Sequence, residues 1–315
     1  MNRPLVSVCI PCRNSERHLA QALDSVLAQS YPAMETIVVD DGSTDGSPGI
    51  LRQYRERGVK VINECCGSAS KARNAGLRHA QGELIKFLDA DDVISRECVA
   101  AQVGRLTDRD DAVASSQWGR FYNDDLDTFR PNPEPNWKDM ESTEWLVEAC
   151  IDCRGMMQAG MFLIPRGLLE KSGPWNEGLT LIDDFEFFSR VLCAAKDVLF
   201  CPEAVLYYRS GTPGTLSGQK TRAAYESMTE SILLGTGHLL ARRQDERARL
   251  AAANVCQHGV YDLYPQHHDL RRKLEARIKE CGGSNVPPFG GRYFHALRPF
   301  IGWKLAKRLQ KLAGR

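Results

Sequence analysis

Long apolar runs are absent from this 315-residue chain, so no stretch of about 18 apolar residues is available to span a membrane. Residues 1–14 also lack the apolar core and small-residue cleavage site of a secretion signal, and we interpret them as a strand. There is no GxGxxG sequence, which disfavours a dehydrogenase, and no Gly-Lys pair, which excludes a P-loop enzyme. The 11 cysteines are scattered rather than regularly spaced, which disfavours structural zinc and is typical of thiols in a reducing cytoplasm.

Charge is unevenly distributed along a chain whose net charge is only +1. From residue 240 onward there are 16 Lys and Arg but 6 Asp and Glu, so an acidic body precedes a basic tail. In 294–315 basic residues flank an apolar helical face made of Ile301, Leu305, Leu309 and Leu312. This segment suits an anionic membrane surface, or alternatively a helix packed on its own domain. Nucleic-acid binding through the tail has no motif to support it.

Strands and helices alternate through the first hundred residues. Apolar, β-branched runs predict strands at Leu5–Pro11, Thr36–Val39, Val59–Ile62 and Leu84–Leu88. The segments between these strands carry apolar residues at helical spacing. This order predicts an α/β fold with right-handed βαβ units and a mostly parallel sheet flanked by helices. In such sheets ligands bind beyond the carboxyl ends of the strands.

The second half of the chain is expected to complete the site. Three prolines in Phe129–Trp137 predict an extended loop, and a strand is expected at Met161–Ile164. Asp183 opens an apolar segment that predicts a helix through Leu192, and residues from about 220 onward are expected to form several helices. We therefore predict a catalytic domain over residues 1–218 and a helical C-terminal extension over residues 219–315 with a basic amphipathic end.

Carboxylates gather where two of the predicted strands end. Asp40 and Asp41 follow the second strand, where they can accept hydrogen bonds from a base or a ribose, or simply form a turn. Asp89 and Asp91 follow the fourth strand and are separated by one residue. Such a pair can share a divalent cation such as Mg²⁺, although an Asp cap on the next helix is the simpler interpretation.

Three further positions carry candidate chemistry. Asp183 and Asp184 stand at a helix start, where the helix dipole stabilises them and where one can act as a general base on a hydroxyl. Trp175, after a Gly-Pro pair, suggests a rigid aromatic wall on the approach to them. Lys71 and Arg73, at the beginning of a predicted helix, can reach a diphosphate or form a solvated helix face.

Four segments, in this order, resemble the family 2 inverting glycosyltransferases: VSVCIPCRN, ETIVVDDGSTDGS, ASKARNAGLRHAQGELIKFLDADD and GPWNEGLTLIDDFEFFSRVL. The resemblance covers about residues 5–217. It implies the GT-A fold, a Rossmann-like sheet with one nucleotide-sugar site. It also implies transfer of one sugar from a nucleoside-diphosphate donor, most commonly a UDP-sugar, with Mg²⁺ or Mn²⁺ as cofactor. The implied acceptor is a glycan or a lipid-linked precursor used in cell-surface glycan synthesis.

The resemblance assigns a role to each matching residue. Asp184 takes the position of the catalytic base, and Asp183 stands where the family has Glu. Asp91 takes the position of the metal ligand. The donor contacts are assigned to Pro11, Arg13, Asn14, Asp40, Asp41, Lys71, Arg73, Asn74 and Asp89, and the acceptor and lid side to Trp175 and Arg209.

The chain departs from the family pattern in two places. The family's Tyr-Arg-x-His motif ends here in Gly211, and the Gly- and Pro-rich residues 211–218 predict a mobile lid. The Gln-x-x-Arg-Trp motif of processive synthases is absent, which favours single-sugar transfer. A degenerate sugar-nucleotide-binding or scaffold protein is one alternative, and a sugar-nucleotide pyrophosphorylase is another. We expect a cytoplasmic protein, or one bound peripherally to the inner face of the membrane, with no nucleic-acid partner.

Overall fold

The first of two sheets contains the four strands that the sequence predicts. The computed structural model describes residues 3–211 and 220–312, so most of the predicted lid lies outside the described residues. The sheet has the order β3 (Lys60–Asn63), β2 (Met34–Asp40), β1 (Val6–Cys12), β4 (Leu84–Phe87) and β9 (Ile164–Pro165). The first four strands are parallel and β9 is antiparallel to β4. The predicted βαβ units and mostly parallel sheet are therefore confirmed.

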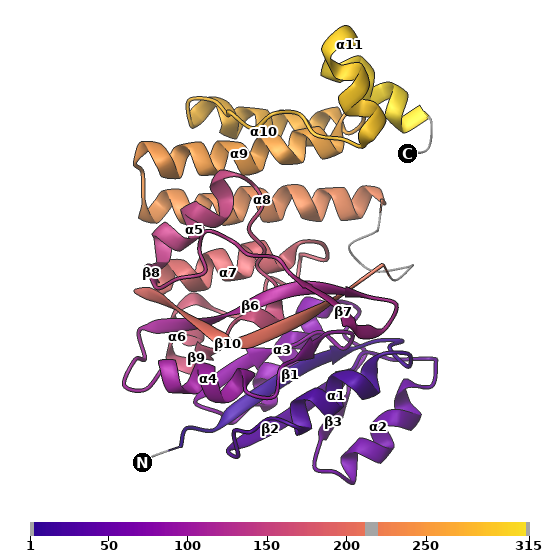
Figure 1. Ribbon diagram of the computed structural model, residues 1–315, viewed down its shortest axis with the longest axis vertical. Helices are drawn as coiled ribbons and strands as arrows, with labels where there is room; N and C mark the ends of the chain where they lie inside the picture. Colours follow the sequence, from indigo (N-terminus) through magenta and orange to yellow (C-terminus); the bar gives the residue numbers. More distant parts are fainter. Residues whose placement is uncertain (1–2, 212–219, 313–315) are drawn as a thin grey trace.

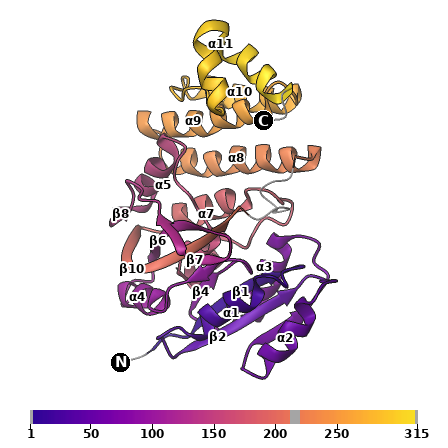
Figure 2. The same ribbon diagram turned by 45° about the vertical axis from the view of Figure 1, so that its right-hand side comes forward.

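Three helices connect these strands, as the apolar spacing indicates: α1 (Leu19–Leu27), α2 (Ser47–Arg55) and α3 (Ala69–His79). Helix α3 packs on β1 and β2 (Figure 2). The close packing depends on Gly76, because a Cβ there would lie 3.2 Å from the Cβ of Cys9 and 3.6 Å from a Val39 methyl group. The first turn of α3 is thereby held against the carboxyl ends of the strands, where the candidate site lies.

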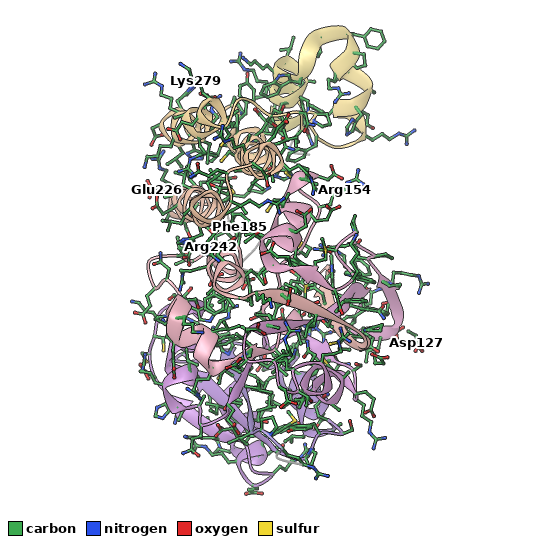
Figure 3. All side chains as sticks on the ribbon, turned by 90° about the vertical axis from the view of Figure 1, so that its left-hand side faces the viewer. Asp127, Arg154, Phe185, Glu226, Arg242 and Lys279 are labelled. Carbon is green, nitrogen blue, oxygen red and sulfur yellow. The ribbon has the colours of Figure 1, made fainter. Side chains whose placement is uncertain are left out.

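A second, mixed sheet was not predicted. It has the order β5 (Val93–Ile94), β10 (Asp197–Ser210), β6 (Ala112–Tyr122) and β7 (Asp125–Pro131), and β8 (Met140–Glu141) also pairs with β10. Strands β10 and β6 are parallel, while β5, β7 and β8 run antiparallel to their neighbours. Asp127 of the β6–β7 hairpin is exposed and points outward (Figure 3).

Two local predictions in this region need correction. The predicted extended loop Phe129–Trp137 begins inside β7, an exposed edge strand whose polar residues give no apolar run to mark it. The predicted strand Met161–Ile164 is instead the end of a 3-10 turn, Ala159–Met161, followed by the short β9. A single bridge from Leu163 to Ala114 joins this segment to β6 of the second sheet.

Before the C-terminal extension the fold also contains the helices α4 (Cys98–Arg105), α5 (Ser142–Ile151), α6 (Arg166–Ser172) and α7 (Asp183–Ala194). Helix α7 begins at the predicted Asp183 and buries four apolar side chains, Phe187, Phe188, Val191 and Leu192. Trp175 stacks on Phe187, with ring centroids 3.9 Å apart, and Phe87 of β4 meets the same ring edge-on. This aromatic contact ties the start of α7 to the first sheet.

The C-terminal residues form helical layers above α7 (Figure 1): α8 (Arg222–Arg242), α9 (Glu246–Leu263), α10 (His268–Glu280) and α11 (Arg292–Leu312). Helices α8 and α7 approach closely at Gly235, where a Cβ would lie 2.5 Å from the Phe185 ring (Figure 3). Leu239, Ala248 and Ala251 of the extension belong to the main core. The extension thus shares the main core with the first part of the chain, and a domain boundary at residue 218 stays a prediction.

The last helix is broken, which corrects the predicted continuous apolar face. Gly302 has φ 74° and ψ 158°, so α11 consists of two half-helices that meet at this residue. Ile301 lies before the break, whereas Leu305, Leu309 and Leu312 lie after it. Helical spacing therefore holds only within each half. None of the helices in the described residues is long and apolar enough to cross a membrane.

Candidate active site

The predicted catalytic residues meet around a buried arginine. Arg73 of α3 donates from Nη2 to Oδ1 of Asp89 (2.8 Å) and from Nη1 to Oδ2 of Asp183 (2.9 Å). Its guanidinium lies 4.4 Å from the centroid of the Trp175 ring. Burial opposes its charge, but the carboxylates of Asp89, Asp183 and Asp184 together raise the pKa of Arg73. Arg73 is therefore the central cation of the site rather than part of a solvated helix face.

The two neighbouring aspartates at the start of α7 have different environments. Asp183 is fixed, because its Oδ2 also accepts a hydrogen bond from Oγ of Ser70 at 2.6 Å. Asp184 has a buried Oδ1 with no hydrogen-bond partner in the part of the chain that the structure describes. Burial, reinforced by Asp183 and Asp89 and opposed by Arg73, raises the pKa of Asp184 well above that of an ordinary aspartate. A partnerless carboxylate of raised basicity is suited to accepting a proton.

The turn after β4 brings three further carboxylates to this edge. Burial and the neighbouring Asp89 raise the pKa of Asp91 to about 6. Asp92 is fully enclosed, and its Oδ1 accepts the backbone N–H of Arg209 at 2.9 Å. Among the described residues no three Asp, Glu, His or Cys side chains form a metal-ligating group. Asp91 with Asp89 nevertheless fits Mg²⁺ or Mn²⁺, which often bind one or two carboxylates and complete their shell with substrate phosphates and water.

The ends of β1 and β2 form the nucleotide side that the sequence predicts. Asp41 is buried, and its Oδ1 accepts the N–H of Gly67 at 2.7 Å. Its Oδ2 lies 3.5 Å from Nη1 of Arg13, whose side chain is largely exposed. Asp40 is also buried and accepts the N–H of Ser43 at 3.0 Å, so the turn interpretation holds for its Oδ1. These residues are brought together at the carboxyl edge, and donor contacts by them stay a prediction.

Pro11 and Asn14 lie on the same edge. Pro11 is in β1, in register with Val39 of β2. Asn14 has φ 50°, a left-handed conformation that asparagine tolerates, and its Oδ1 accepts the N–H of Thr44 at 2.8 Å. This bond joins the loop after β1 to the loop after β2. The bond therefore fixes the two loops beside which a nucleotide is predicted to bind.

Sequence comparison decides the family. Residues 7–167 match the model of the family described as "Glycosyl transferase family 2", about half of the chain. The uncharacterized glycosyltransferase EpsJ of Bacillus subtilis is 30% identical over 296 residues, which is 90% of this chain and 80% of EpsJ. The chain belongs to glycosyl transferase family 2. A second relative, the putative teichuronic acid biosynthesis glycosyltransferase TuaG of B. subtilis, is 38% identical over 42% of this chain, a match that spans 54% of TuaG.

Solved structures agree with this family 2 assignment at the level of the fold. S. aureus TarS 1-349 in complex with UDP covers 98% of this chain and 92% of its own length, with a TM-score of 0.63 and 18% identity. The mannosyltransferase PcManGT from Pyrobaculum calidifontis, in complex with GDP-Man and Mn²⁺, covers 99% and 85%, with a TM-score of 0.59 and 18% identity. The predicted GT-A fold is confirmed by these likenesses.

Two residues of this family 2 enzyme that were assigned to the acceptor side have buried side chains. Arg209 donates from Nη1 to Oδ1 of Asp124 (2.6 Å), from Nη2 to Oε1 of Gln21 (2.5 Å) and from Nε to the carbonyl of Asp91 (2.7 Å). Trp175 is 1% exposed and lies beneath Arg73. Both support residues of the site: Arg209 binds the carbonyl of Asp91, and Trp175 packs against the guanidinium of Arg73. A direct contact with an acceptor stays a prediction for both.

Two further candidates on α3 differ in their surroundings. Lys71 is exposed on the first turn, where the side chain of Ser68 caps the helix by accepting the Lys71 N–H at 3.3 Å. Asn74 is buried and bonded to the loop before α7: its Oδ1 accepts the Trp175 N–H, and its Nδ2 donates to the Trp175 carbonyl and to Glu177, each at 2.9 Å. Asn74 thus fixes this loop, whereas the exposed side chain of Lys71 can turn toward a nucleotide-sugar donor.

Sequence reasoning missed three residues that shape the site: Ser70, Asp92 and Asp124. Ser70 and Asp92 both lie inside the segment ASKARNAGLRHAQGELIKFLDADD. Ser70 is a small residue on a predicted helix and Asp92 directly follows Asp91, so neither was distinguished from its neighbours. Asp124 comes from the β6–β7 turn, at φ 60°, and binds both Arg17 and Arg209. No local pattern could have found it, because its partner Arg209 is 85 residues away in the chain.

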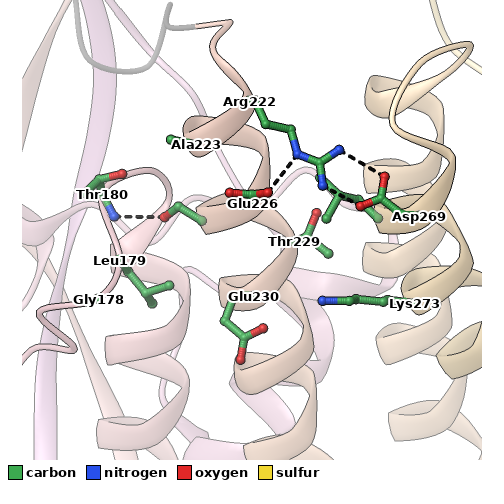
Figure 4. Close-up of a pocket in the computed structure, with 12 residues that line it drawn as sticks. Gly178, Leu179, Thr180, Arg222, Ala223, Glu226, Thr229, Glu230, Asp269 and Lys273 are labelled. Atoms are coloured by element: carbon green, nitrogen blue, oxygen red, sulfur yellow. Dashed lines mark hydrogen bonds and ion pairs between the residues drawn. The ribbon is translucent and has the colours of Figure 1, made fainter.

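A polar groove lies on the other side of the loop before α7 (Figure 4). It measures about 460 Å³ and is bounded by residues 178–180, α8 and α10. Arg222 is paired with Glu226 (2.7 Å) and with both oxygens of Asp269. Lys273 extends from α10 toward α8 (Figure 4). The Leu179 carbonyl accepts the same Ser70 hydroxyl that binds Asp183, so one loop separates the groove from Asp183 and Asp184.

Proposed function

We propose that this family 2 glycosyltransferase is an inverting, metal-dependent enzyme that moves one sugar from a nucleoside-diphosphate sugar, most simply a UDP-sugar, to an acceptor hydroxyl. We place the reaction on the cytoplasmic side of a membrane, in the synthesis of a cell-surface glycan. The observation that carries the proposal is the buried, partnerless Oδ1 of Asp184 beside the Arg73 and Asp89 pair. All 11 cysteines are free, as a reducing compartment would keep them.

The proposed reaction is a direct displacement. Asp184 removes the proton of the acceptor hydroxyl while that oxygen attacks the anomeric carbon and the bond to the nucleoside diphosphate breaks. Asp183, held by Ser70 and Arg73, positions the start of α7 and with it Asp184. Asp91 would hold a Mg²⁺ or Mn²⁺ ion, and such an ion offsets the charge of the leaving diphosphate. Lys71 and Arg13, both exposed beside the site, can add charge-assisted hydrogen bonds to the phosphates.

Similar proteins support the donor and the pathway. Solved structures of TarS are in complex with UDP and with UDP-GlcNAc, and that of PcManGT is in complex with GDP-Man and Mn²⁺. TuaG carries the name of a teichuronic acid biosynthesis enzyme. A degenerate binding protein would retain the nucleotide edge but would not need a carboxylate with raised pKa at Asp184. The intact Asp91 and Asp184 favour transfer, and family 2 membership disfavours a sugar-nucleotide pyrophosphorylase.

Nucleotide binding that depends on metal is the first expected result. With UDP at a hundred times its Kd and Mn²⁺ present, the protein is expected to gain about 2.7 kcal/mol of stability. The Asp91→Ala variant should lose the part of this gain that requires Mn²⁺, because Asp91 supplies the metal ligand. The measurement is thermal unfolding with UDP, GDP, dTDP and CDP, each with and without Mn²⁺. A wild-type protein that no nucleotide stabilises would instead support the degenerate alternative.

We further propose that the groove of Figure 4 holds a sugar of the acceptor next to the one that carries the reacting hydroxyl, because only residues 178–180 separate the groove from Asp183 and its lining offers carboxylate, hydroxyl and ammonium groups. Lys273→Glu should raise the acceptor KM about tenfold, the effect of roughly one lost hydrogen bond to a charged group. Donor hydrolysis without an acceptor should be unchanged. Transfer to disaccharide acceptors measures the effect, and transfer to the methyl glycosides of glucose, galactose and N-acetylglucosamine, which are too short to reach the groove, should be unchanged. Lys279→Glu, on α10 but outside the groove, is the matched control, and equal KM values for the two variants would exclude the groove.

A further inference from the structure

Exposed apolar side chains are concentrated on the last helix. Eight large hydrophobic side chains are exposed among the described residues, and six of them belong to α11. The two others belong to other parts of the chain, Tyr122 to the end of β6 and Ile182 to the residues before α7. The six are Tyr293, Leu297, Phe300, Leu305, Leu309 and Leu312, with Phe300 at 86% and Leu312 at 84% exposure. A concentration of this kind marks an interaction surface, whereas single exposed hydrophobics do not.

Three of the six side chains line one groove across the break at Gly302. Tyr293, Leu297 and Phe300 follow helical spacing in the first half, and Leu305, Leu309 and Leu312 repeat it in the second. The two sets meet in an almost wholly apolar groove of about 570 Å³, which has Tyr293 and Leu297 on one side and Leu309 on the other. Figures 1 and 2 show α11 at the end of the molecule opposite the first sheet.

The opposite side of α11 is packed on the protein. Trp303 lies between Tyr261 of α9 and Tyr264, with ring centroids 5.0 Å and 4.9 Å away. Lys307 is buried, and its Nζ donates to the Phe289 carbonyl at 3.2 Å. Of the two alternatives that the sequence left open, packing on the protein thus accounts for the inner side of α11. It leaves Leu297, Phe300, Leu305, Leu309 and Leu312 exposed on the outer side.

Charge indicates what covers the outer side. No Asp or Glu follows Glu280 in the sequence, and Arg292, Lys304 and Arg308 are exposed on α11. A second copy placed face to face would bring these cations against their own equivalents, which is unfavourable. An anionic lipid surface instead complements them, while its headgroup and acyl boundary accepts the apolar side chains.

We infer that α11 docks this protein on an anionic lipid bilayer through the exposed hydrophobics and the flanking lysine and arginines. The inference extends the proposed function, since it places the enzyme where a lipid-linked acceptor would be presented. Membrane binding is nevertheless measured without any sugar transfer. Failure of docking and failure of the proposed function are therefore distinguishable.

The test is co-sedimentation of the full chain with vesicles of phosphatidylcholine alone and of phosphatidylcholine mixed with phosphatidylglycerol. Binding is expected with the anionic vesicles and should weaken as salt is added. A Lys304→Glu and Arg308→Glu double variant should lower the partition coefficient at least about tenfold. A Phe300→Ser and Leu312→Ser double variant should lower it as well, because both side chains are exposed and would insert into the bilayer.

The matched control is Arg272→Glu with Lys279→Glu, an equal change of charge on exposed residues of α10. This control should retain most of the binding, and nucleotide-dependent thermal stabilisation should be the same for all variants. Three outcomes would overturn the inference: no sedimentation with anionic vesicles, equal loss in the control, or unchanged binding in the α11 variants. A concentration-dependent dimer that Phe300→Ser abolishes in sedimentation velocity, without vesicle binding, would assign the surface to a second copy instead.

Discussion

An Asp184→Asn variant is expected to lose sugar transfer by at least about 10²–10⁴-fold, the usual contribution of a general base. Asparagine has the same shape but cannot accept the acceptor's proton. Nucleotide binding should be retained, because the nucleotide edge at Asp40 and Asp41 is formed by other elements. The measurement is kcat for transfer, with nucleotide-dependent thermal stabilisation as the binding control. A variant with near wild-type turnover would remove Asp184 from the role.

The acidic limb of the pH profile provides an independent check. A base must be ionised to act, so kcat/KM of the wild type should fall as the pH drops through the pKa of Asp184. Because burial raises that pKa, the fall should come at higher pH than for an ordinary aspartate, whose pKa is about 3.9. An exposed carboxylate that precedes the opposite end of β6 from Asp124, Asp110, supplies the matched control Asp110→Asn, which should leave both kcat and the profile unchanged.

The Asp184→Asn substitution should also raise the free energy of unfolding at neutral pH. A carboxyl group whose pKa is higher in the folded state than in the unfolded state binds protons more tightly when folded, so its ionisation costs stability as the pH rises. At pH 7 the neutral amide introduced by Asp184→Asn avoids this cost. Thermal unfolding at pH 7 is expected to shift upward, whereas Asp183→Asn, which breaks bonds to Ser70 and Arg73, should shift it downward.

Local sequence patterns were sufficient to predict the strands and helices whose buried side chains recur at regular spacing. Strands β1, β2 and β4 and helix α7 are marked by apolar runs at strand or helix spacing, and their positions agree with the predictions within a few residues. The candidate site follows from these elements, because the carboxyl ends of parallel strands meet at one edge. Arg73 illustrates the limit. The sequence identified Arg73 as a candidate site residue. Its pairing with Asp183, 110 residues away, depends on how α3 and α7 pack and could not be predicted.

The second sheet and the last helix show why other features were missed. Strand β7 is an exposed edge whose alternating polar residues resemble a loop, and β5 has only two residues. In α11 the apolar spacing continues on both sides of Gly302, although its positive φ breaks the helix there. Spacing alone cannot distinguish a continuous helix from two that meet at a glycine. The partition of this helix into a packed side and an exposed side also depends on contacts with α9.

The largest expected effect on stability comes from Arg73. An Arg73→Met variant keeps much of the length of the side chain but removes the cation that Asp89, Asp183 and Asp184 share. Breaking a buried ion pair by removing one partner typically costs about 3–5 kcal/mol. With roughly 2–4 °C of melting temperature for each kcal/mol in a large domain, the midpoint should fall by roughly 6–20 °C. Thermal unfolding at pH 7, followed by circular dichroism, measures it.

Two companion variants separate charge from packing in this cluster. Arg73→Lys retains the charge but cannot bond two carboxylates in a planar fork, so its loss of stability should be smaller than that of Arg73→Met. Adding Asp183→Asn to Arg73→Met removes one of the unpaired carboxylates and should recover part of the loss, because residues in direct contact are not additive. The deficit of Arg73→Met relative to the wild type should also shrink at low pH, where the carboxylates become protonated. If the three variants lost equal stability at every pH, Arg73 would stabilise the site by packing on Trp175 rather than by its charge.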